Sequence, residues 1–414
     1  MERVNTFIDQ NTPGLVGRLK RLVEFPTVNP PGQDYDGITS YLTRELGLVG
    51  LNARRFTIPP KVAQAHLPPD QHAYPRYNVL GKLKSPGAKK TIHFNAHFDV
   101  VPVSGAWRHG SPFSGAIEKG LIYGRGTADM KGSIASLLGA LDAIHKTGTK
   151  PRMNVEVSFT ADEETDSFLG TRWMVEEGPI KPDYAVVMEG AEGDEVCCGH
   201  NGNVWLEVTV QGRAAHGSTP QEGINALEKM AALVLELDAY RQQIAKTTFV
   251  TPEGKTMTPT INLGGVFGGG PGAKINTVPA LATFSIDRRV LATEDHGKAE
   301  KDLRAFLAAA AKRIPDCRIS IAKISENFSS FTKPGLPFFK AVAASVQAVR
   351  KNPTKFRVST GFNDIHFFNH YLKIPTLGYG PGGDDIHAVD EKARISDLVD
   401  SAKIYAHLLT TFAG

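Results

Sequence analysis

Apolar positions recur at helical spacing near the start of the chain and predict helices over residues 15–25 and 36–46. The pattern breaks at Pro26 and at the turn Asn29-Pro30-Pro31-Gly32. A proline-rich loop is expected over residues 59–77. Beyond it, short apolar runs alternate with helical stretches, predicting strands at 91–96, 154–160 and 184–188 and helices at 131–146 and 169–177. Such alternation predicts an α/β domain whose central sheet is covered by helices on both faces.

The pattern changes after Glu189. Between residues 203 and 324 it predicts strands at 204–211, 258–267, 280–287 and 318–324, and helices at 223–240 and 295–313. Their order is β-α-β-β-α-β, a self-contained supersecondary unit. We therefore expect an inserted domain over residues 201–325, and a discontinuous first domain made of residues 1–200 and 326–414.

Composition and charge narrow the class of protein. The 414 residues carry 47 basic and 43 acidic side chains, a formal net charge of +4, without a basic block of the kind that binds nucleic acid. Charges interrupt the apolar runs at the amino terminus, so we expect no signal peptide and no membrane span. Cys197, Cys198 and Cys317 cannot form a disulfide framework. They are expected to be reduced thiols in a cytoplasmic protein.

The first candidate chemistry follows the strand expected at 91–96. His97 and Asp99 are two residues apart, so in a strand they project to one face. An imidazole binds a transition metal well, and a carboxylate beside it can orient the ring. A structural histidine next to a helix-capping aspartate would give the same pattern.

Two acidic segments follow. Asp129 lies in the glycine-containing segment 124–132 just before a helix, where it could cap the helix or bridge two metals. Asp162, Glu163 and Glu164 end the strand expected at 154–160. Consecutive acids are usually a solvated turn, but the carboxyl edge of an α/β sheet is where ligands bind. There, one glutamate can ligate a metal while its neighbour acts as a general base.

Glu189 ends a further apolar run, and His387 lies in the glycine-rich segment 380–391. Either residue alone would be unremarkable. Together with the residues above they form a set of nitrogen and oxygen ligands without thiolate: His97, Asp129, Glu164, Glu189 and His387. Such a set would serve two zinc ions about 3.5–4 Å apart that share one carboxylate.

In their order along the chain, the motifs His-Phe-Asp-Val-Val-Pro (97–102), Gly-Arg-Gly-Thr-Ala-Asp-Met-Lys-Gly (124–132), Asp-Glu-Glu (162–164) and the glycine loop with His387 resemble the M20 metallopeptidase family. The resemblance covers nearly the whole chain. It implies a catalytic domain of the di-zinc aminopeptidase type with a mixed central sheet, and an inserted ferredoxin-like domain that acts as a lid and forms a homodimer. The activity implied is amide hydrolysis by a metal-bound hydroxide.

The resemblance also implies roles for single residues. Asp129 would bridge two divalent metals, zinc by default with cobalt or manganese as alternatives. His97 and Glu189 would complete one site, and Glu164 and His387 the other. Asp99 would orient a ligand and Glu163 would be the general base.

In the inserted domain, the resemblance implies that His216 stabilises the oxyanion, from its own subunit or a partner. Asn276 and Arg289 would hold a substrate carboxylate, although Arg288 could take the place of Arg289. Gly361 and His366 match substrate-binding positions. His366 stands where many relatives have arginine, a departure from the pattern for succinyl-like acyl groups, and Gly190 replaces a common proline.

The predicted function is therefore hydrolysis of an amide bond in an N-acyl amino acid, a small peptide or a related small molecule that carries a carboxylate. One alternative is hydrolytic removal of an amino or carbamoyl group from an unusual small molecule, aromatic ones included, since Phe362, Phe367, Phe368 and Tyr371 could line an aromatic pocket or pack in the core. A second alternative is a metal-binding scaffold without catalysis. Glu163 argues against the scaffold, because such a protein has no need of a base.

Overall fold

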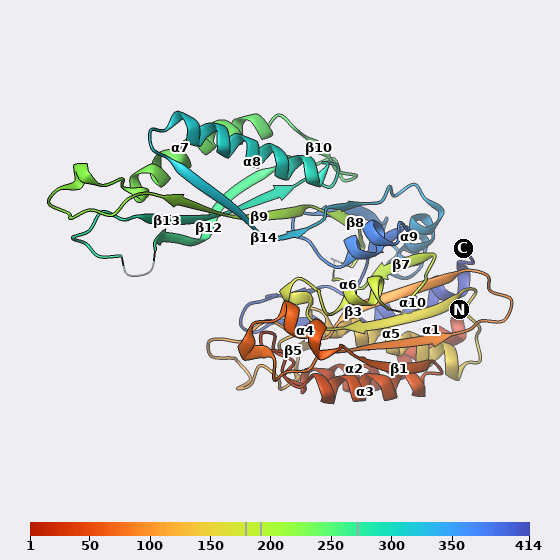
Figure 1. The fold of residues 1–414 in the computed structure, drawn as a ribbon. Coiled ribbons are helices and arrows are strands. Elements are labelled where there is room, and N and C mark those ends of the chain that lie inside the picture. Colours follow the sequence, from red (N-terminus) through yellow and green to blue (C-terminus); the bar gives the residue numbers. More distant parts are fainter. Residues whose placement is uncertain (179, 191–192, 271–272) are drawn as a thin grey trace. The chain divides into compact units, whose positions relative to one another are not determined.

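The computed structural model describes residues 1–178, 180–190, 193–270 and 273–414. The chain divides into two compact units. Unit 1 contains Met1–Gly199, Thr332–Arg357 and Asn363–Gly414, and unit 2 contains His200–Phe331 and Val358–Phe362. Figure 1 shows the fold coloured along the sequence.

The largest sheet of the described chain is mixed, with the order β1-β2-β6-β3-β7-β17-β8-β15, and β16 pairs with β8. Its strands are β1 (Asn52–Thr57), β2 (Tyr77–Leu83), β3 (Thr91–His97), β6 (Asn154–Thr160), β7 (Tyr184–Val187), β8 (Glu195–His200), β15 (Ser330–Phe331), β16 (Lys355–Ser359) and β17 (Thr376–Gly378). In its centre β3 runs parallel to both β6 and β7. The α/β class and the mixed sheet are thus confirmed.

Helices in unit 1 bury their apolar sides on this sheet and on each other. They are α1 (Glu2–Gln10), α2 (Thr12–Val23), α3 (Tyr35–Leu48), α4 (Pro60–His66), α5 (Lys131–Lys146), α6 (Thr171–Glu176), α9 (Pro337–Arg350) and α10 (Ile395–Thr411). Helix α5 is buried nearly all round, as expected for a helix that packs on α2, on α10 and on β3. Helix α6 packs in a buried hydrophobic cluster that also contains Phe367 and Phe368. Those two rings pack in the core, in agreement with the core interpretation of this aromatic stretch.

A small sheet has the order β18-β19-β5-β4 and joins two segments far apart in the sequence. Its strands are β4 (Ala116–Glu118), β5 (Leu121–Tyr123), β18 (Gly383–Asp384) and β19 (Lys392–Arg394). Two of its strands therefore frame the loop that carries His387, and β5 leads into the segment that carries Asp129.

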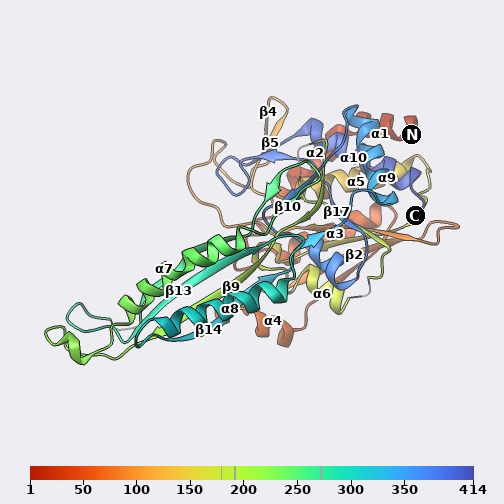
Figure 2. The same ribbon diagram turned by 90° about the horizontal axis from the view of Figure 1, so that it is seen from above.

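Unit 2 is a four-stranded antiparallel sheet with the order β12-β13-β9-β14. Its elements are β9 (Gly202–Gln211), α7 (Ala226–Ile244), the short pair β10 (Phe249–Val250) and β11 (Thr256–Met257), β12 (Thr260–Gly269), β13 (Leu281–Val290), α8 (His296–Arg313) and β14 (Arg318–Asn327). Helices α7 and α8 run along the strands on one face of the sheet (Figure 2). Apart from the β10–β11 pair, the order is the β-α-β-β-α-β predicted from the sequence.

One predicted loop is a helix in the structure. Residues 59–77, expected to be a loop, contain α4, whose first residue is Pro60. Proline lacks an N–H and has a fixed φ, so it breaks a helix interior but suits a first turn. None of the helices in the described ranges has both the length and the apolar character needed to cross a membrane.

Candidate active site

The carboxyl ends of three neighbouring parallel strands gather the first set of candidate ligands. His97 is the last residue of β3 and pairs in register with Thr160 of β6, and on the other side Asn95 pairs with Val187 of β7. Glu163 and Glu164 follow β6 in a short 3-10 turn, and Glu189 comes two residues after β7. Because the three strands are parallel, these side chains emerge at one edge of the sheet.

Asp129 lies between two histidines. One carboxylate oxygen is 3.1 Å from Nε2 of His97, and the other is 3.1 Å from Nε2 of His387. The N-cap of α5 is Met130, and no side chain makes a capping hydrogen bond there. The capping interpretation of Asp129 is therefore wrong, because its carboxylate is turned toward the imidazoles.

The glycines of the carboxyl-terminal loop allow this approach. A Cβ atom on Gly383 would lie 2.3 Å from Cβ of Ala128, so only glycine permits the two segments to come so close. His387 itself has a positive φ of 64°. Its Nε2 atom is 3.2 Å from Glu164, in addition to its contact with Asp129.

The potential ligand atoms form two groups that share Asp129. One group is His97, Asp129 and Glu189, and the other is Asp129, Glu164 and His387. Within each group the ligand atoms lie within 4.8 Å of one another. The five residues singled out in the sequence are thus brought together, and Glu163 lies beside them in a further group with His97 and Glu164.

Asp99 makes hydrogen bonds that hold several residues of this cluster in place. Its buried carboxylate accepts hydrogen bonds from the backbone N–H groups of Glu163 and Glu164, both at 3.2 Å, and from Asn29 at 3.0 Å. It also lies 3.5 Å from Nδ1 of His97, while the Asp99 carbonyl oxygen is 3.0 Å from the same nitrogen. Asp99 therefore fixes both a candidate ligand and the turn that carries two glutamates.

Electrostatics at the histidines reflect their carboxylate neighbours. Hydrogen bonds to Asp129 and Glu164 raise the pKa of His387 to about 10. Burial alone would lower the pKa of His97, but its hydrogen bonds to Asp129 and Asp99 raise it well above its usual value. Burial would raise the pKa of Asp129, but its hydrogen bonds to the two imidazoles have the larger effect. The pKa of Asp129 is therefore lowered.

The glutamates show the opposite shift. Burial and the charge of Asp129 raise the pKa of Glu189 to about 8. Burial, with the negative neighbours Glu189 and Glu164, raises the pKa of Glu163 well above its usual value. A cluster of buried carboxyl groups that repel one another is stabilised by added positive charge, which is what bound cations provide.

Glu391 contacts the candidate site but was not singled out from the sequence, although it ends the glycine-loop motif. Its fully buried carboxylate accepts hydrogen bonds from the backbone N–H groups of Gly126, Ala128 and Asp129, at 2.9–3.1 Å. Arg125 donates to its other oxygen at 2.6 Å. Glu391 thus fixes the peptide groups around Asp129.

Asp162, the first acid of its run, was also given no role. Its buried carboxylate accepts hydrogen bonds from Arg76 at 2.7 Å, from the hydroxyl of Tyr35 at 2.9 Å and from Asn29 at 3.0 Å. The backbone of Asp162 is left-handed, with φ of 61°. The only sequence signal was its place beside Glu163, since the partners are 86 to 133 residues away.

The residues expected to bind substrate lie in both units. In unit 2, His216 and Asn276 are exposed neighbours: His216 forms a β-bridge with Thr277, and the Asn276 carbonyl accepts a hydrogen bond from Gly217. Gly361 is also exposed in unit 2, whereas His366, in unit 1, is buried and its Nδ1 lies 2.7 Å from the Asn363 carbonyl.

The two adjacent arginines occupy opposite faces of β13. Arg288 is buried on the helix-covered face and pairs with Glu294 at 2.7 Å. The side chain of Arg289 is 31% exposed on the other face and pairs with Asp287 at 2.9 Å. Arg289 is therefore the one of the two with a side chain accessible to a ligand.

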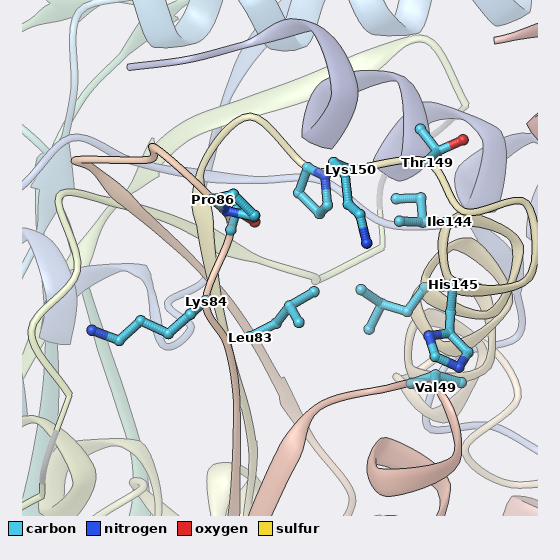
Figure 3. Close-up of a pocket in the computed structure, with 11 residues that line it drawn as sticks. Val49, Leu83, Lys84, Pro86, Ile144, His145, Thr149 and Lys150 are labelled. Atoms are coloured by element: carbon cyan, nitrogen blue, oxygen red, sulfur yellow. The ribbon is translucent and has the colours of Figure 1, made fainter.

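A cavity of about 180 Å³ in unit 1 lies at the far end of α5 from Asp129. Figure 3 shows Lys150 extending toward this cavity while Lys84 points away. Its titratable lining residues are His145, Lys84 and Lys150, so it offers no carboxylate. This cavity is separate from the cluster of candidate ligands.

The amino-acid sequence is similar to those of known proteins. The model of peptidase family M20/M25/M40 matches residues 93–411. A succinyl-diaminopimelate desuccinylase of Gluconacetobacter diazotrophicus is 28% identical over 413 residues, covering 98% of each chain. Another from Rhodopseudomonas palustris is 30% identical over 418 residues, covering 97% of this chain and 99% of the relative.

Solved structures share the fold. The dipeptidase Dug1p from Saccharomyces cerevisiae superposes with a TM-score of 0.74 at 18% identity, covering 100% of this chain and 98% of the other. A dinuclear metal-binding peptidase from Bacillus subtilis superposes with a TM-score of 0.70 at 13% identity, covering 97% and 98%.

Proposed function

The chain belongs to peptidase family M20/M25/M40 and is a metal-dependent amide hydrolase, and from this premise we propose that it cleaves an N-acyl amino acid or small peptide with Glu163 as the general base. The observation that carries the proposal is Asp129, whose two oxygens each face a different imidazole at 3.1 Å. A carboxylate so placed is suited to bridge two cations.

The residues present fit two divalent ions. His97 and Glu189 would hold one ion, Glu164 and His387 the other, and Asp129 both. Imidazole nitrogen and carboxylate oxygen without thiolate suit zinc at a catalytic site, with cobalt or manganese as alternatives. Ions bound there would polarise a carbonyl oxygen and acidify a water molecule.

The proton transfers fall to Glu163. Its carboxylate takes a proton from the water whose oxygen attacks the carbonyl carbon of the amide. When the carbon–nitrogen bond breaks, Glu163 returns that proton to the leaving nitrogen, so the products are a carboxylic acid and an amine. Asp99 keeps Glu163 in place through its backbone N–H.

Residues of unit 2 would bind and orient the substrate. Arg289 presents a guanidinium, the group best suited to a carboxylate because it can donate two parallel hydrogen bonds. Asn276 would add an amide contact, and His216 would donate to the oxyanion. Gly361 and His366 are proposed to border the bound acyl group.

We also propose that the chain forms a homodimer through unit 2. Strand β12 is an edge of its sheet, and the side chains of Val266 and Phe267 on it are 53% and 79% exposed. An unpaired edge with exposed apolar groups favours pairing with another chain. Light scattering should then give twice the chain mass of 44.8 kDa, whereas a monomer at micromolar concentration would contradict this proposal.

Replacing Glu163 by glutamine tests the mechanism. We expect Glu163→Gln to keep its metal content and to lose about 10²–10⁴-fold in kcat, because the amide cannot accept the proton. Turnover would be measured on acetylated and succinylated amino acids and on dipeptides. The control is Glu176→Gln on α6, which removes an exposed pair with Arg172 and should keep full activity. Unchanged turnover in Glu163→Gln would refute the assigned role.

A further inference from the structure

Asp364 is a buried carboxylate that joins the last segment of unit 1 to the turn after β6. It is the second residue of Asn363–Gly414, the segment that follows Val358–Phe362 of unit 2 in the sequence. Asp364 is only 2% exposed. One of its oxygens accepts a hydrogen bond from the Ser167 hydroxyl and the other accepts one from the Thr171 hydroxyl, both at 2.5 Å. Such short distances are usual where an O–H group donates to a carboxylate.

Ser167 closes the turn that carries Glu163. Its backbone N–H donates to the Asp162 carbonyl oxygen at 2.7 Å, so the turn begins at Asp162 and ends at Ser167. Both end residues have a positive φ, 61° at Asp162 and 54° at Ser167. That conformation is unfavourable for residues other than glycine and persists only where surrounding contacts hold it. Arg76 pairs with the carboxylate at the first end, and Asp364 holds the hydroxyl at the second.

Thr171 links the same carboxylate to two strands. This residue begins α6, and its hydroxyl oxygen accepts a hydrogen bond from Nδ2 of Asn95 on β3 at 3.0 Å. Oγ1 of Thr160, the last residue of β6, is also 3.0 Å from it. Asp364 is therefore connected through one hydroxyl to both strands that lead into the cluster of candidate ligands.

The backbone around Asp364 is anchored in the core. Its carbonyl oxygen accepts a hydrogen bond from the N–H of Phe367 at 3.2 Å. The side chains of Ile365, Phe367 and Phe368 are buried in the hydrophobic cluster that also contains residues of α6. Side chains in such a core are closely packed, so the segment that carries Asp364 has little freedom to move. The carboxylate can thus hold the Ser167 hydroxyl in one place.

The turn is held at three points. Arg76 holds its first residue, Asp99 accepts a hydrogen bond from the N–H of Glu163 in its middle at 3.2 Å, and Asp364 holds Ser167 at its end. Arg76 and Asp99 precede the turn in the sequence, whereas Asp364 is 197 residues away from Ser167. The third contact therefore comes from a segment that no local motif connects to the turn.

We propose that Asp364 is a positioning residue for the base, which keeps the Glu163 carboxylate in reach of the attacking water by holding Ser167 at the end of the turn. The inference rests on the proposed function and adds to it a residue outside the groups of candidate ligands. Misplacing a catalytic group by about 1 Å can cost about 100-fold in rate, so a contact at the end of the turn can control the reaction.

A double-mutant cycle tests whether Asp364 acts through Glu163. The metal-loaded protein would be assayed on the best substrate among acetylated and succinylated amino acids and dipeptides. Asp364→Asn should lower kcat about 10–100-fold and leave KM unchanged, because the base is displaced while the substrate contacts remain. In the Glu163→Gln background, the same change should lower the remaining kcat by about twofold or less, because no base is left to displace.

Two further variants guard against a general loss of structure. Ser167→Ala removes only the hydroxyl at the end of the turn and should lower kcat about tenfold, even where Asp364→Asn does not fold. The control Asp142→Asn removes a mostly buried carboxylate that pairs with Arg18 near the far end of α5, and it should keep full kcat. Denaturant titration would establish that each variant is folded.

Two outcomes of the kinetic test would overturn the positioning role. One is an equal fold loss of kcat from Asp364→Asn in the native and the Glu163→Gln backgrounds, because Asp364 would then act independently of the base. The other is an unchanged kcat in both Asp364→Asn and Ser167→Ala.

Hydrogen exchange separates this inference from the proposed function. The backbone amides of residues 162–167 should exchange about tenfold faster in Asp364→Asn than in the native protein, because a hydrogen bond to a charged group is lost. If the native protein hydrolyses none of these amides yet this faster exchange is found, the function fails and the positioning of the turn stands. Unchanged exchange would refute the positioning whatever the enzyme hydrolyses.

Discussion

At the scale of single residues, the candidate centre depends on side chains that would not themselves touch a metal. Glu391 uses one carboxylate oxygen to hold three backbone N–H groups of the segment 126–129 and the other to hold Arg125. It lies only four residues after His387. One residue thus ties the peptide around the central carboxylate to the loop that supplies a histidine.

Replacing Glu391 by glutamine should therefore weaken metal binding. We expect Glu391→Gln to lose about 10–100-fold in metal affinity, the usual cost of disturbing a group that orients a ligand. Competition with a chelator would measure the affinity. Glu118→Gln, which removes a partly exposed partner of Arg108, provides the comparison and should change nothing. Equal affinities in the two variants would show that Asp129 is positioned without Glu391.

The sequence could identify the five candidate ligands because each belongs to a compact motif, such as His97 with Asp99 or the run 162–164. It could not identify Arg76 as the partner of Asp162, because nothing local links residues 86 positions apart. It also could not choose between Arg288 and Arg289. That choice depends on the strand face, which a one-residue shift in register reverses.

At the scale of elements, the turn after β6 is a tightly constrained segment of the site. Asp162, Asp166 and Ser167 all have positive φ, an unfavourable conformation for residues other than glycine. The buried ion pair between Asp162 and Arg76 holds this turn, and the Arg76 side chain is fully buried. This turn carries Glu163 and Glu164.

Removing the arginine should leave a buried charge unpaired. We expect Arg76→Met to lower the free energy of unfolding by about 3–5 kcal/mol, whereas Arg55→Met, which breaks an exposed pair with Asp36, should cost about 1 kcal/mol or less. Denaturant titration would measure both. If the two variants lost the same stability, the pair would not be what holds the turn.

Element prediction succeeded where periodicity was strong and failed where local chemistry was ambiguous. Helix α5 and strand β6 have the bounds expected from the sequence, because a long apolar helix and a strand of alternating apolar and polar residues are distinctive. Helix α4 was missed because its two neighbouring prolines, Pro59 and Pro60, suggested a loop. Very short strands such as β4 and β18 carry too few residues to show a period.

At the scale of the whole molecule, metal uptake should be coupled to pH. In the metal-free protein the pKa of His387 is raised to about 10 and that of Glu189 to about 8, so both hold protons at pH 7. A ligand must lose its proton to coordinate, so binding releases protons and the apparent affinity rises with pH up to about those values.

Calorimetry in two buffers of different ionisation enthalpy would count the protons released at pH 7. We expect more than one proton per protein, and fewer in His387→Ala, which cannot contribute its own. An affinity that does not change between pH 6 and pH 7.5 would contradict the assignment of these residues as ligands.

The insertion of unit 2 into unit 1 also sets the order in which the centre can be assembled during synthesis. His97, Asp129 and Glu189 all precede residue 200, so one group of ligands exists before unit 2 has been translated. His387 follows unit 2, so the second group is completed only when the carboxyl-terminal segment emerges from the ribosome. Domains tend to fold as they are made, from the amino terminus onward. The nascent chain therefore carries one of the two candidate ligand groups early, whereas the other is complete only after unit 2 and the segment after it have been synthesised.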